Sequence, residues 1–172
     1  MTIIPRLALL LLIGGMAACT NPDRFDNDPS VNLGNNAGVA GIDPGSDPTS
    51  VTYFQSTIGD RVLFEVDQST LTDEARTVLA QQATWLASNP EYTAVIEGHA
   101  DEQGTREYNL ALGNRRASAV SEYLVAQGVA ANRLKTVTYG KERPLEVCSA
   151  EACYAKNRRG VTILQAGAGA GA

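Results

Sequence analysis

The pattern of apolar and polar positions predicts alternating strands and helices from about residue 51 onward. Residues 61–66 form a short, mostly apolar run that is typical of a strand. A helix is expected next, because Thr72 is a suitable N-cap and acidic residues follow it in the first turn. Pro90 lies beyond the end of this helix. The residues expected on its buried face recur at helical spacing and are Ala75, Val78, Leu79, Gln82 and Leu86, with Trp85 beside them.

A second helix is expected to begin after Thr105 and to stop at Gly128. Its buried stripe is expected to consist of Ala117, Val120 and Leu124. Gly113 lies inside this helix, where glycine costs about 1 kcal/mol relative to alanine. We therefore expect either a break or close packing at Gly113, with Arg116 in the first turn of the longer piece.

The remaining pattern completes one domain over residues 51–165. Strands are expected around residues 95–96, 134–139 and 160–164, with a short helix around 150–156. Strands that alternate with helices imply an α/β fold in which helices pack on a four-stranded mixed sheet, an α+β sandwich. The closing Gly-Ala repeat, residues 166–172, is a low-complexity tail.

The N-terminus carries an apolar run over residues 7–13 that is too short to span a bilayer and suits the core of a signal peptide. Residues 16–19, Met-Ala-Ala-Cys, resemble a bacterial lipobox, which makes residues 1–18 a lipoprotein signal peptide and Cys19 the lipidated residue. The alternative is an ordinary secretory signal that leaves Cys19 unmodified. Thr20 follows, where aspartate is typical of retention in the inner membrane, so an outer-membrane destination is expected.

Residues 19–50 are expected to form the lipidated cysteine and a flexible tether. Residues 20–50 contain five Asn, five Asp, four Pro and four Gly without a helical or strand period. Such a composition cannot bury enough apolar surface to offset chain entropy. The formal net charge is −5, and removing residues 1–18 removes only Arg6 among charged residues, giving −6. This balance argues against nucleic-acid binding.

Two further cysteines, Cys148 and Cys153, lie five residues apart in a chain that is expected to be exported. A disulfide between them suits an oxidising compartment, and reduced thiols are the alternative. A metal site is disfavoured, because the spacing is not CxxC and the chain has one histidine. We expect neither a metal nor a cofactor.

Residues 96–120 place an acid-rich turn between a strand and a helix that bears two adjacent arginines. Asp101 follows the strand, where its carboxylate can accept an ammonium group, while a guanidinium and helix amides hold an acid group. This arrangement suits a zwitterionic ligand. Catalysis by His99, Asp101 and Glu102 is the other hypothesis, but the sequence shows no nucleophile elbow and no glycine-rich phosphate loop, so no enzyme is expected.

Several blocks resemble the OmpA-like peptidoglycan-binding domains, and in particular those of the peptidoglycan-associated lipoprotein (Pal) family. The resemblance extends from Val62 to Leu164, with Val66 replacing a frequent aromatic. The blocks are GHADEQGTREYNLALGNRRA (98–117), VLFEVDQSTL (62–71), VTYGKERP (137–144) and AKNRRGV (155–161).

The resemblance implies that Asp101 and Arg116 grip the diaminopimelate of a peptidoglycan stem peptide. The remaining pocket residues that it implies are Asp67, Thr105, Asn109 and Leu112. Two alternatives remain: Arg115 or Arg116 pairs with Glu107 or Glu122 on an exposed helix face, and Asn109 only caps a helix break.

The resemblance further implies an outer-membrane lipoprotein whose domain faces the periplasm, tethers the membrane to the cell wall and takes part in envelope integrity and cell division. The expected partners are peptidoglycan and the Tol-Pal system, with the β-propeller protein TolB competing for the same face. The alternatives are a generic OmpA-like wall-binding lipoprotein outside the Tol system and a murein-modifying enzyme.

Overall fold

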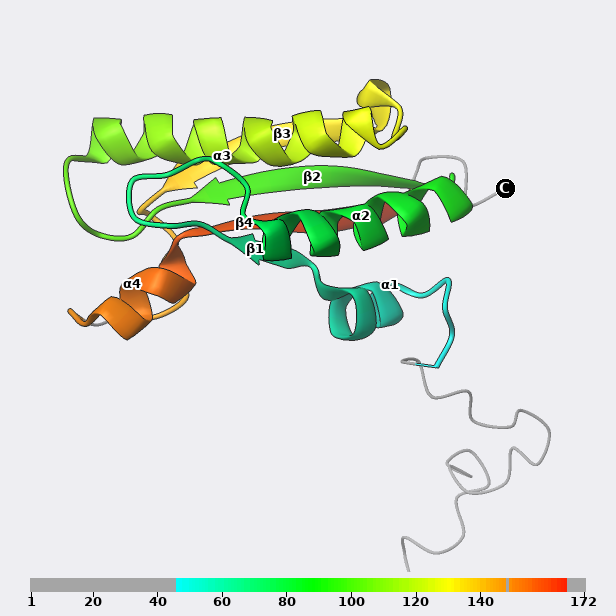
Figure 1. Ribbon diagram of the computed structural model, residues 1–172, viewed down its shortest axis with the longest axis horizontal. Coiled ribbons are helices and arrows are strands. Elements are labelled where there is room, and N and C mark those ends of the chain that lie inside the picture. The colour runs from blue at the N-terminus through cyan, green and yellow to red at the C-terminus, as the bar shows by residue number, and fades with distance from the viewer. Residues whose placement is uncertain (1–45, 148, 167–172) are drawn as a thin grey trace, which may run out of the picture. The chain divides into compact units, whose positions relative to one another are not determined.

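The computed structural model describes residues 46–147 and 149–166, which build a four-stranded mixed sheet (Figure 1). The strands lie in the order β1-β4-β2-β3, with β2 and β3 parallel and the other pairs antiparallel. Their bounds are β1 Arg61–Leu63, β2 Tyr92–His99, β3 Leu134–Gly140 and β4 Arg159–Ala166. The predicted fold class is therefore confirmed.

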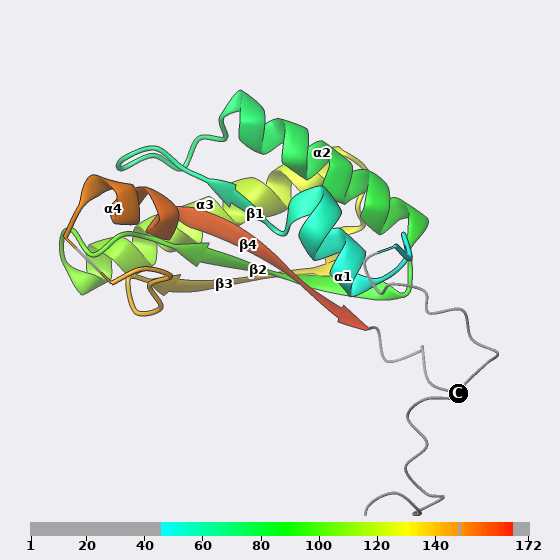
Figure 2. The same cartoon turned by 90° about the horizontal axis from the view of Figure 1, so that it is seen from below.

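Helices α2 and α3 run along the sheet and cover one of its faces (Figures 1 and 2). The helical segments are α1 Val51–Tyr53, the π-helical η2 Phe54–Gly59, α2 Asp73–Ser88, α3 Arg106–Ala126, the 3-10 turn η3 Ala131–Arg133 and α4 Glu151–Asn157. Within the described ranges, no helix has the length and apolar character needed to cross a membrane.

Helix α2 forms as its sequence predicts. The hydroxyl of Thr72 accepts a hydrogen bond from the Ala75 N–H, which satisfies one of the free donors of the first turn. Leu79 and Leu86 are fully buried between the helix and the sheet. Gln82 is also fully buried, because its amide is paired at both ends, with the Gly59 carbonyl and the Thr162 hydroxyl.

Helix α3 is continuous, so of the two outcomes expected at Gly113 the structure shows close packing. A Cβ atom on Gly113 would lie 2.5 Å from the Thr138 hydroxyl and 2.8 Å from the Gly98 carbonyl oxygen. The two glycines bring the backbones of α3 and β2 into contact. The placement of Arg116 in a first helical turn is wrong, because the helix already begins at Arg106. The predicted stripe is confirmed: Ala117, Val120 and Leu124 are all fully buried.

Three local features differ from the sequence pattern. Strand β1 ends at Leu63, because Phe64 turns into the core and its N–H donates to the Arg158 carbonyl. The helical segment over residues 51–59 was not predicted. Residues 46–50, counted with the tether, contact the domain: the Trp85 indole N–H donates to the Pro48 carbonyl at 2.6 Å, and Ser50 caps α1. Residues 46–50 are therefore described together with the domain.

Candidate functional site

Strands β1 and β2 finish at the same end of the sheet (Figure 1). The predicted site residues follow these strands in the chain or lie between the start and the middle of α3. Three segments converge at that end of the sheet: the loop that follows β1, the turn between β2 and α3, and the junction of α4 with β4. Because β2 leads into the first turn of α3 through residues 100–105, this end carries free helix amides as well as side chains.

Arg116 is fully buried and holds three carbonyl oxygens, two from the loop that follows β1 and one from the last residue of β2. Its Nε donates to the Gln68 carbonyl at 2.8 Å, its Nη1 to the His99 carbonyl at 2.8 Å and its Nη2 to the Glu65 carbonyl at 3.1 Å. The guanidinium carbon lies 5.1 Å from the centre of the Phe64 ring, within cation–π range. The alternative that placed Arg116 on an exposed helix face is therefore wrong.

The charge of Arg116 survives this burial. Burial lowers the pKa of Arg116 to about 10, and the negative charge of Asp101 opposes that effect more than any other neighbour does. At neutral pH the site thus contains a desolvated positive charge. Three bonds use three of the five guanidinium N–H groups, so the group retains donors for a further acceptor.

Asp101 is close enough to influence Arg116 electrostatically, but its ion-pair partner is Arg158. The Arg158 Nη1 lies 3.2 Å from the Asp101 Oδ2, and the Gln103 N–H donates to the Asp101 Oδ1. Arg158 also donates to the Glu151 carboxylate at 2.5 Å and to the Phe64 carbonyl at 3.2 Å. Among the described residues, no hydrogen bond joins Asp101 directly to Arg116.

Arg158 is the residue of this site that the sequence analysis missed. It is almost fully buried and ties the end of β1 to α4 and to the turn after β2. Its block, residues 155–161, was noted for resemblance, but nothing local distinguishes Arg158 from Arg159.

The other four predicted residues divide into exposed and buried positions. Asp67 is exposed in a left-handed backbone conformation, with φ 56°, and its Oδ1 accepts a hydrogen bond from the Tyr108 hydroxyl at 3.1 Å. Thr105 is the N-cap of α3. Asn109 and Leu112 are buried, and the Asn109 amide donates to the Gln103 carbonyl at 2.7 Å. Since α3 is continuous, the hypothesis that Asn109 caps a helix break is wrong.

His99 is packed inside the domain and does not have the setting of a catalytic base. Its ring is buried, its Nε2 lies 3.3 Å from the Glu97 carboxylate, and it contacts the Tyr139 ring. Burial, followed by the positive charges of Arg159 and Arg143, lowers the pKa of His99 to about 4. The imidazole is therefore neutral at pH 7 and a weak base. No group of three acidic, histidine or cysteine side chains in the described part of the chain could hold a metal ion.

Of the three cysteines with a predicted covalent modification, only Cys153 lies among the described residues. Cys19 and Cys148 lie outside the described residues, so lipidation stays a prediction. Cys153 is disulfide-bonded, and its predicted pairing with Cys148 likewise stays a prediction.

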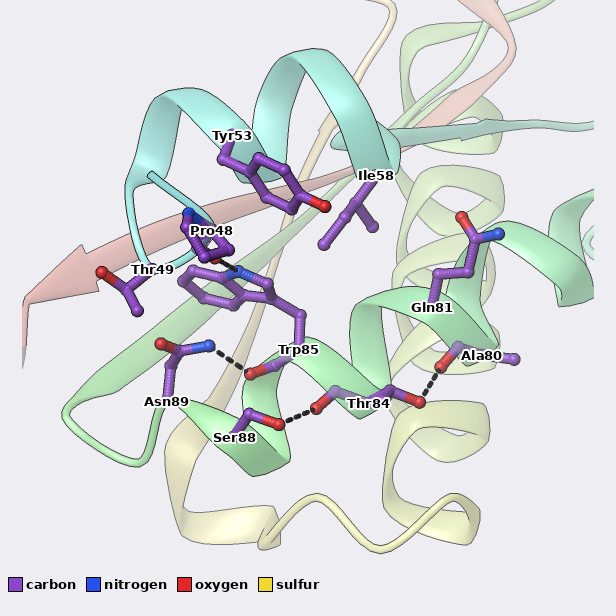
Figure 3. Close-up of a pocket in the computed structure, with 10 residues that line it drawn as sticks. All are labelled: Pro48, Thr49, Tyr53, Ile58, Ala80, Gln81, Thr84, Trp85, Ser88 and Asn89. Atoms are coloured by element: carbon purple, nitrogen blue, oxygen red, sulfur yellow. Dashed lines mark hydrogen bonds between the residues drawn. The ribbon is translucent and has the colours of Figure 1, made fainter. Parts of the chain in front are cut away.

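A separate groove of about 580 Å³ lies between α2 and the segment over residues 48–58 (Figure 3). Its walls include Tyr53, Ile58 and Trp85, and none of its lining residues is charged. The Trp85 indole is mostly buried and tilted against the rings of Phe54 and Tyr92. A hollow without charge does not suit a zwitterion, so the charged end of the sheet is the better candidate site.

Comparison with known proteins gives a consistent assignment. Residues 63–158 match the OmpA family. The peptidoglycan-associated lipoprotein of Brucella melitensis is 50% identical over 139 residues, which cover 80% of this chain and 82% of that protein. The peptidoglycan-associated lipoprotein of Mesorhizobium japonicum is 47% identical over 165 residues, which cover 96% of this chain and 94% of that protein.

Solved structures show the same relationship. The crystal structure of the peptidoglycan-associated lipoprotein from Burkholderia pseudomallei is 38% identical with a TM-score of 0.63, covering 72% of this chain and all of that one. The C-terminal domain of Helicobacter pylori MotB shares the fold, at 20% identity and a TM-score of 0.59. The match covers 63% of this chain and 86% of that one. The chain belongs to the OmpA family and, within it, to the peptidoglycan-associated lipoproteins.

Proposed function

We propose that this protein binds peptidoglycan non-covalently through the diaminopimelate of the stem peptide. The observation that carries the proposal is the buried Arg116 guanidinium with the carboxylates of Asp67 and Asp101 near it. The names of the relatives point to the same polymer.

The chemistry of the ligand matches this charge arrangement. A diaminopimelate side chain ends in an ammonium and a carboxylate on one carbon, so its site needs a cationic donor and an anionic acceptor a few ångströms apart. The guanidinium of Arg116 would hold the carboxylate, because a planar group with several N–H donors suits two oxygens. The carboxylates of Asp101 and Asp67 would receive the ammonium. Thr105, Asn109 and Leu112 would complete and support the pocket.

Arg158 sets a constraint on this mechanism. It already shares the Asp101 carboxylate, so the ammonium must compete with a buried guanidinium for the Asp101 Oδ2. Glu151 also pairs with Arg158 and can retain that partner when Asp101 turns to the ligand. Arg158 therefore orients Asp101 in the absence of ligand.

Sedimentation of the purified protein with isolated sacculi tests the proposal. Asp101→Asn keeps the size of the side chain but removes its charge and replaces one of its two acceptor oxygens with an NH2 donor. We expect it to weaken binding by about tenfold or more, since one charge of the ligand loses its partner. The matched control is Glu91→Gln, which removes the same charge at an exposed position just before β2 begins, at its other end. Equal sedimentation of both variants and the wild type would contradict the proposed site.

Arg116→Lys is less selective, for a reason that the structure makes clear. Lysine keeps the charge but cannot hold the two loop carbonyls and the His99 carbonyl of β2 in one plane, so both ligand binding and stability should fall. Its binding loss has meaning only together with a melting curve of the same variant.

The cellular setting that we propose follows from the resemblance. Lipid at Cys19 would anchor the protein in the outer membrane, residues 20–45 would supply the reach, and the domain would engage the wall from the periplasmic side. The Tol-Pal system would be its assembly, with TolB competing with peptidoglycan. Capture of TolB from periplasmic extract tests this part: competition by sacculi fragments supports it, and a lack of capture indicates a wall-binding lipoprotein outside the Tol system.

A further inference from the structure

Residues 65–68 cross over the guanidinium of Arg116 and form a strap, which we define as Glu65–Gln68. Arg116 holds the strap from beneath, because it donates to the carbonyls of Glu65 and Gln68, on either side of Asp67. Asp67 has a left-handed backbone, a conformation that aspartate tolerates better than most residues. Its side chain is therefore carried by a loop that is held at two carbonyls, those of Glu65 and Gln68.

Tyr108 holds the same strap from the outside. Its hydroxyl donates to the Asp67 Oδ1 at 3.1 Å, across 41 residues of sequence. The Tyr108 backbone is itself fixed, since its N–H donates to the Thr105 hydroxyl at the start of α3. The ring lies over Gly104, where an added Cβ would stand 3.6 Å from the Tyr108 Cδ1. The phenol thus extends from the start of α3 to Asp67. Asp67 is the side chain of the strap whose charge acts on Arg116.

The ionisation of Tyr108 agrees with this contact. The hydrogen bond to Asp67 raises the pKa of the phenol, against the opposing positive charges of Arg115 and Arg116. The hydroxyl is therefore a donor throughout the physiological pH range.

We propose that Tyr108 is a positioning residue for ligand binding, whose hydroxyl holds the Asp67 carboxylate beside Arg116 as a ready acceptor for the ammonium of a diaminopimelate ligand. The inference rests on the proposed function. A carboxylate on an exposed loop would otherwise sample several rotamers and would have to be ordered by the ligand. The bond removes that cost before the ligand arrives. Tyr108 is not among the residues that the sequence resemblance implied.

The test is a double-mutant cycle measured by calorimetric titration with a purified muropeptide that contains diaminopimelate. Tyr108→Phe should bind about three- to tenfold more weakly than the wild type. Asp67→Asn retains tolerance of the left-handed backbone but loses the charged acceptor. In that background, adding Tyr108→Phe should change the affinity less than twofold, because the hydroxyl acts through Asp67. Tyr123→Phe, a hydroxyl deletion near the other end of α3, is the matched control and should bind like the wild type.

A ligand-free readout tests the contact itself. In protein labelled on the tyrosine rings, the Tyr108 phenol should titrate above the ordinary pKa of tyrosine, near 10, and should return toward it in Asp67→Asn. A purely packing role for Tyr108 would leave this titration unchanged.

Three results would overturn the inference. Wild-type affinity or tighter binding in Tyr108→Phe would show that the bond has no positioning role or obstructs the ligand. An equal loss in both backgrounds would show that Tyr108 does not act through Asp67. Absence of binding by the wild type would overturn the proposed function and the ligand role of Tyr108 together, whereas the first two results overturn only the latter.

Discussion

Replacing Gly113 with alanine tests whether the contact between α3 and β2 sets the geometry of the site. In an ordinary helix interior this change is favourable by about 1 kcal/mol, because glycine has the larger conformational entropy in the unfolded chain. Here the added methyl group would meet the Thr138 hydroxyl at 2.5 Å and the Gly98 carbonyl oxygen at 2.8 Å, both closer than van der Waals contact. The helix must then move away from the sheet.

Moving the neighbouring atoms away from the added methyl group would cost free energy. The Thr138 hydroxyl donates to the Leu110 carbonyl and accepts from the Gly140 N–H, so rotating it away breaks two hydrogen bonds. The Gly98 carbonyl belongs to the backbone of a central strand. Overpacking of this kind costs about 1–3 kcal/mol. Set against the gain of about 1 kcal/mol in helix propensity, and with two lost hydrogen bonds of about 1 kcal/mol each added, we expect a net loss of about 2–4 kcal/mol.

The same movement reaches the site through Arg116, which lies three residues further along α3. Its Nη1 bond to the His99 carbonyl, next to Gly98 in β2, should lengthen as the helix moves out. Affinity for sacculi should therefore fall together with stability.

Thermal and urea unfolding measure the stability term. A loss of about 1 kcal/mol lowers the Tm of a domain of this size by about 4 °C. The matched control is Asn114→Ala, which improves helix propensity at the next, exposed position and should stabilise the domain by a few tenths of a kcal/mol. If Gly113→Ala were as stable as Asn114→Ala, the close backbone contact would not be a constraint on the fold.

Three further predictions concern the anchor, the tether and pH. Cys19→Ser should leave the protein free in the periplasm, because stable membrane attachment requires lipid chains. Deleting residues 22–36 should leave the Tm unchanged and reduce only the simultaneous attachment to membrane and wall, since that segment is expected to supply length. The pKa of His99 is lowered to about 4 by burial and by the charges of Arg159 and Arg143, so the unfolded chain binds its proton more readily. The stability contributed by the neutral imidazole should be complete above about pH 6.5 and fall by up to about 1.4 kcal/mol per pH unit toward pH 4.

Each of these three predictions can be contradicted by a specific result. Cys19→Ser protein that fractionates with outer membranes after peptidoglycan digestion would contradict the lipid anchor. A large drop in Tm on the deletion would show that residues 22–36 pack on the domain. For pH, His99→Gln should have a flatter urea-stability profile between pH 4 and 6.5, and an unchanged slope would assign the dependence to other groups.

Local chemistry made most elements predictable. Thr72 and Thr105 cap their helices as expected, because a side-chain hydroxyl next to free amides acts within one turn. The segment over residues 51–59 was not predictable in this way. It is held by tertiary contacts, chiefly the fully buried Phe54 against Trp85, rather than by a periodic pattern of its own.

The site was predictable in its position and less so in its contacts. Arg116 lies four residues from Leu112 and from Val120, so helical spacing already places it on the buried stripe, whereas Arg115 falls outside it. The pairing of Asp101 with Arg158 spans 57 residues and depends on how α4 meets the sheet, which no local pattern specifies.

The central claim is that the site recognises the side-chain carboxylate of diaminopimelate in addition to its ammonium group, and calorimetric titration with three stem peptides tests it most directly. The peptides differ only at the third residue, which is diaminopimelate, its amide on the side-chain carboxylate, or lysine. Varying the ligand leaves the buried network of Arg116 intact, so stability does not enter the comparison. We expect the amidated and lysine peptides each to bind at least about tenfold more weakly, a difference of about 1.4 kcal/mol. Equal affinity for all three peptides would contradict recognition of the carboxylate by Arg116.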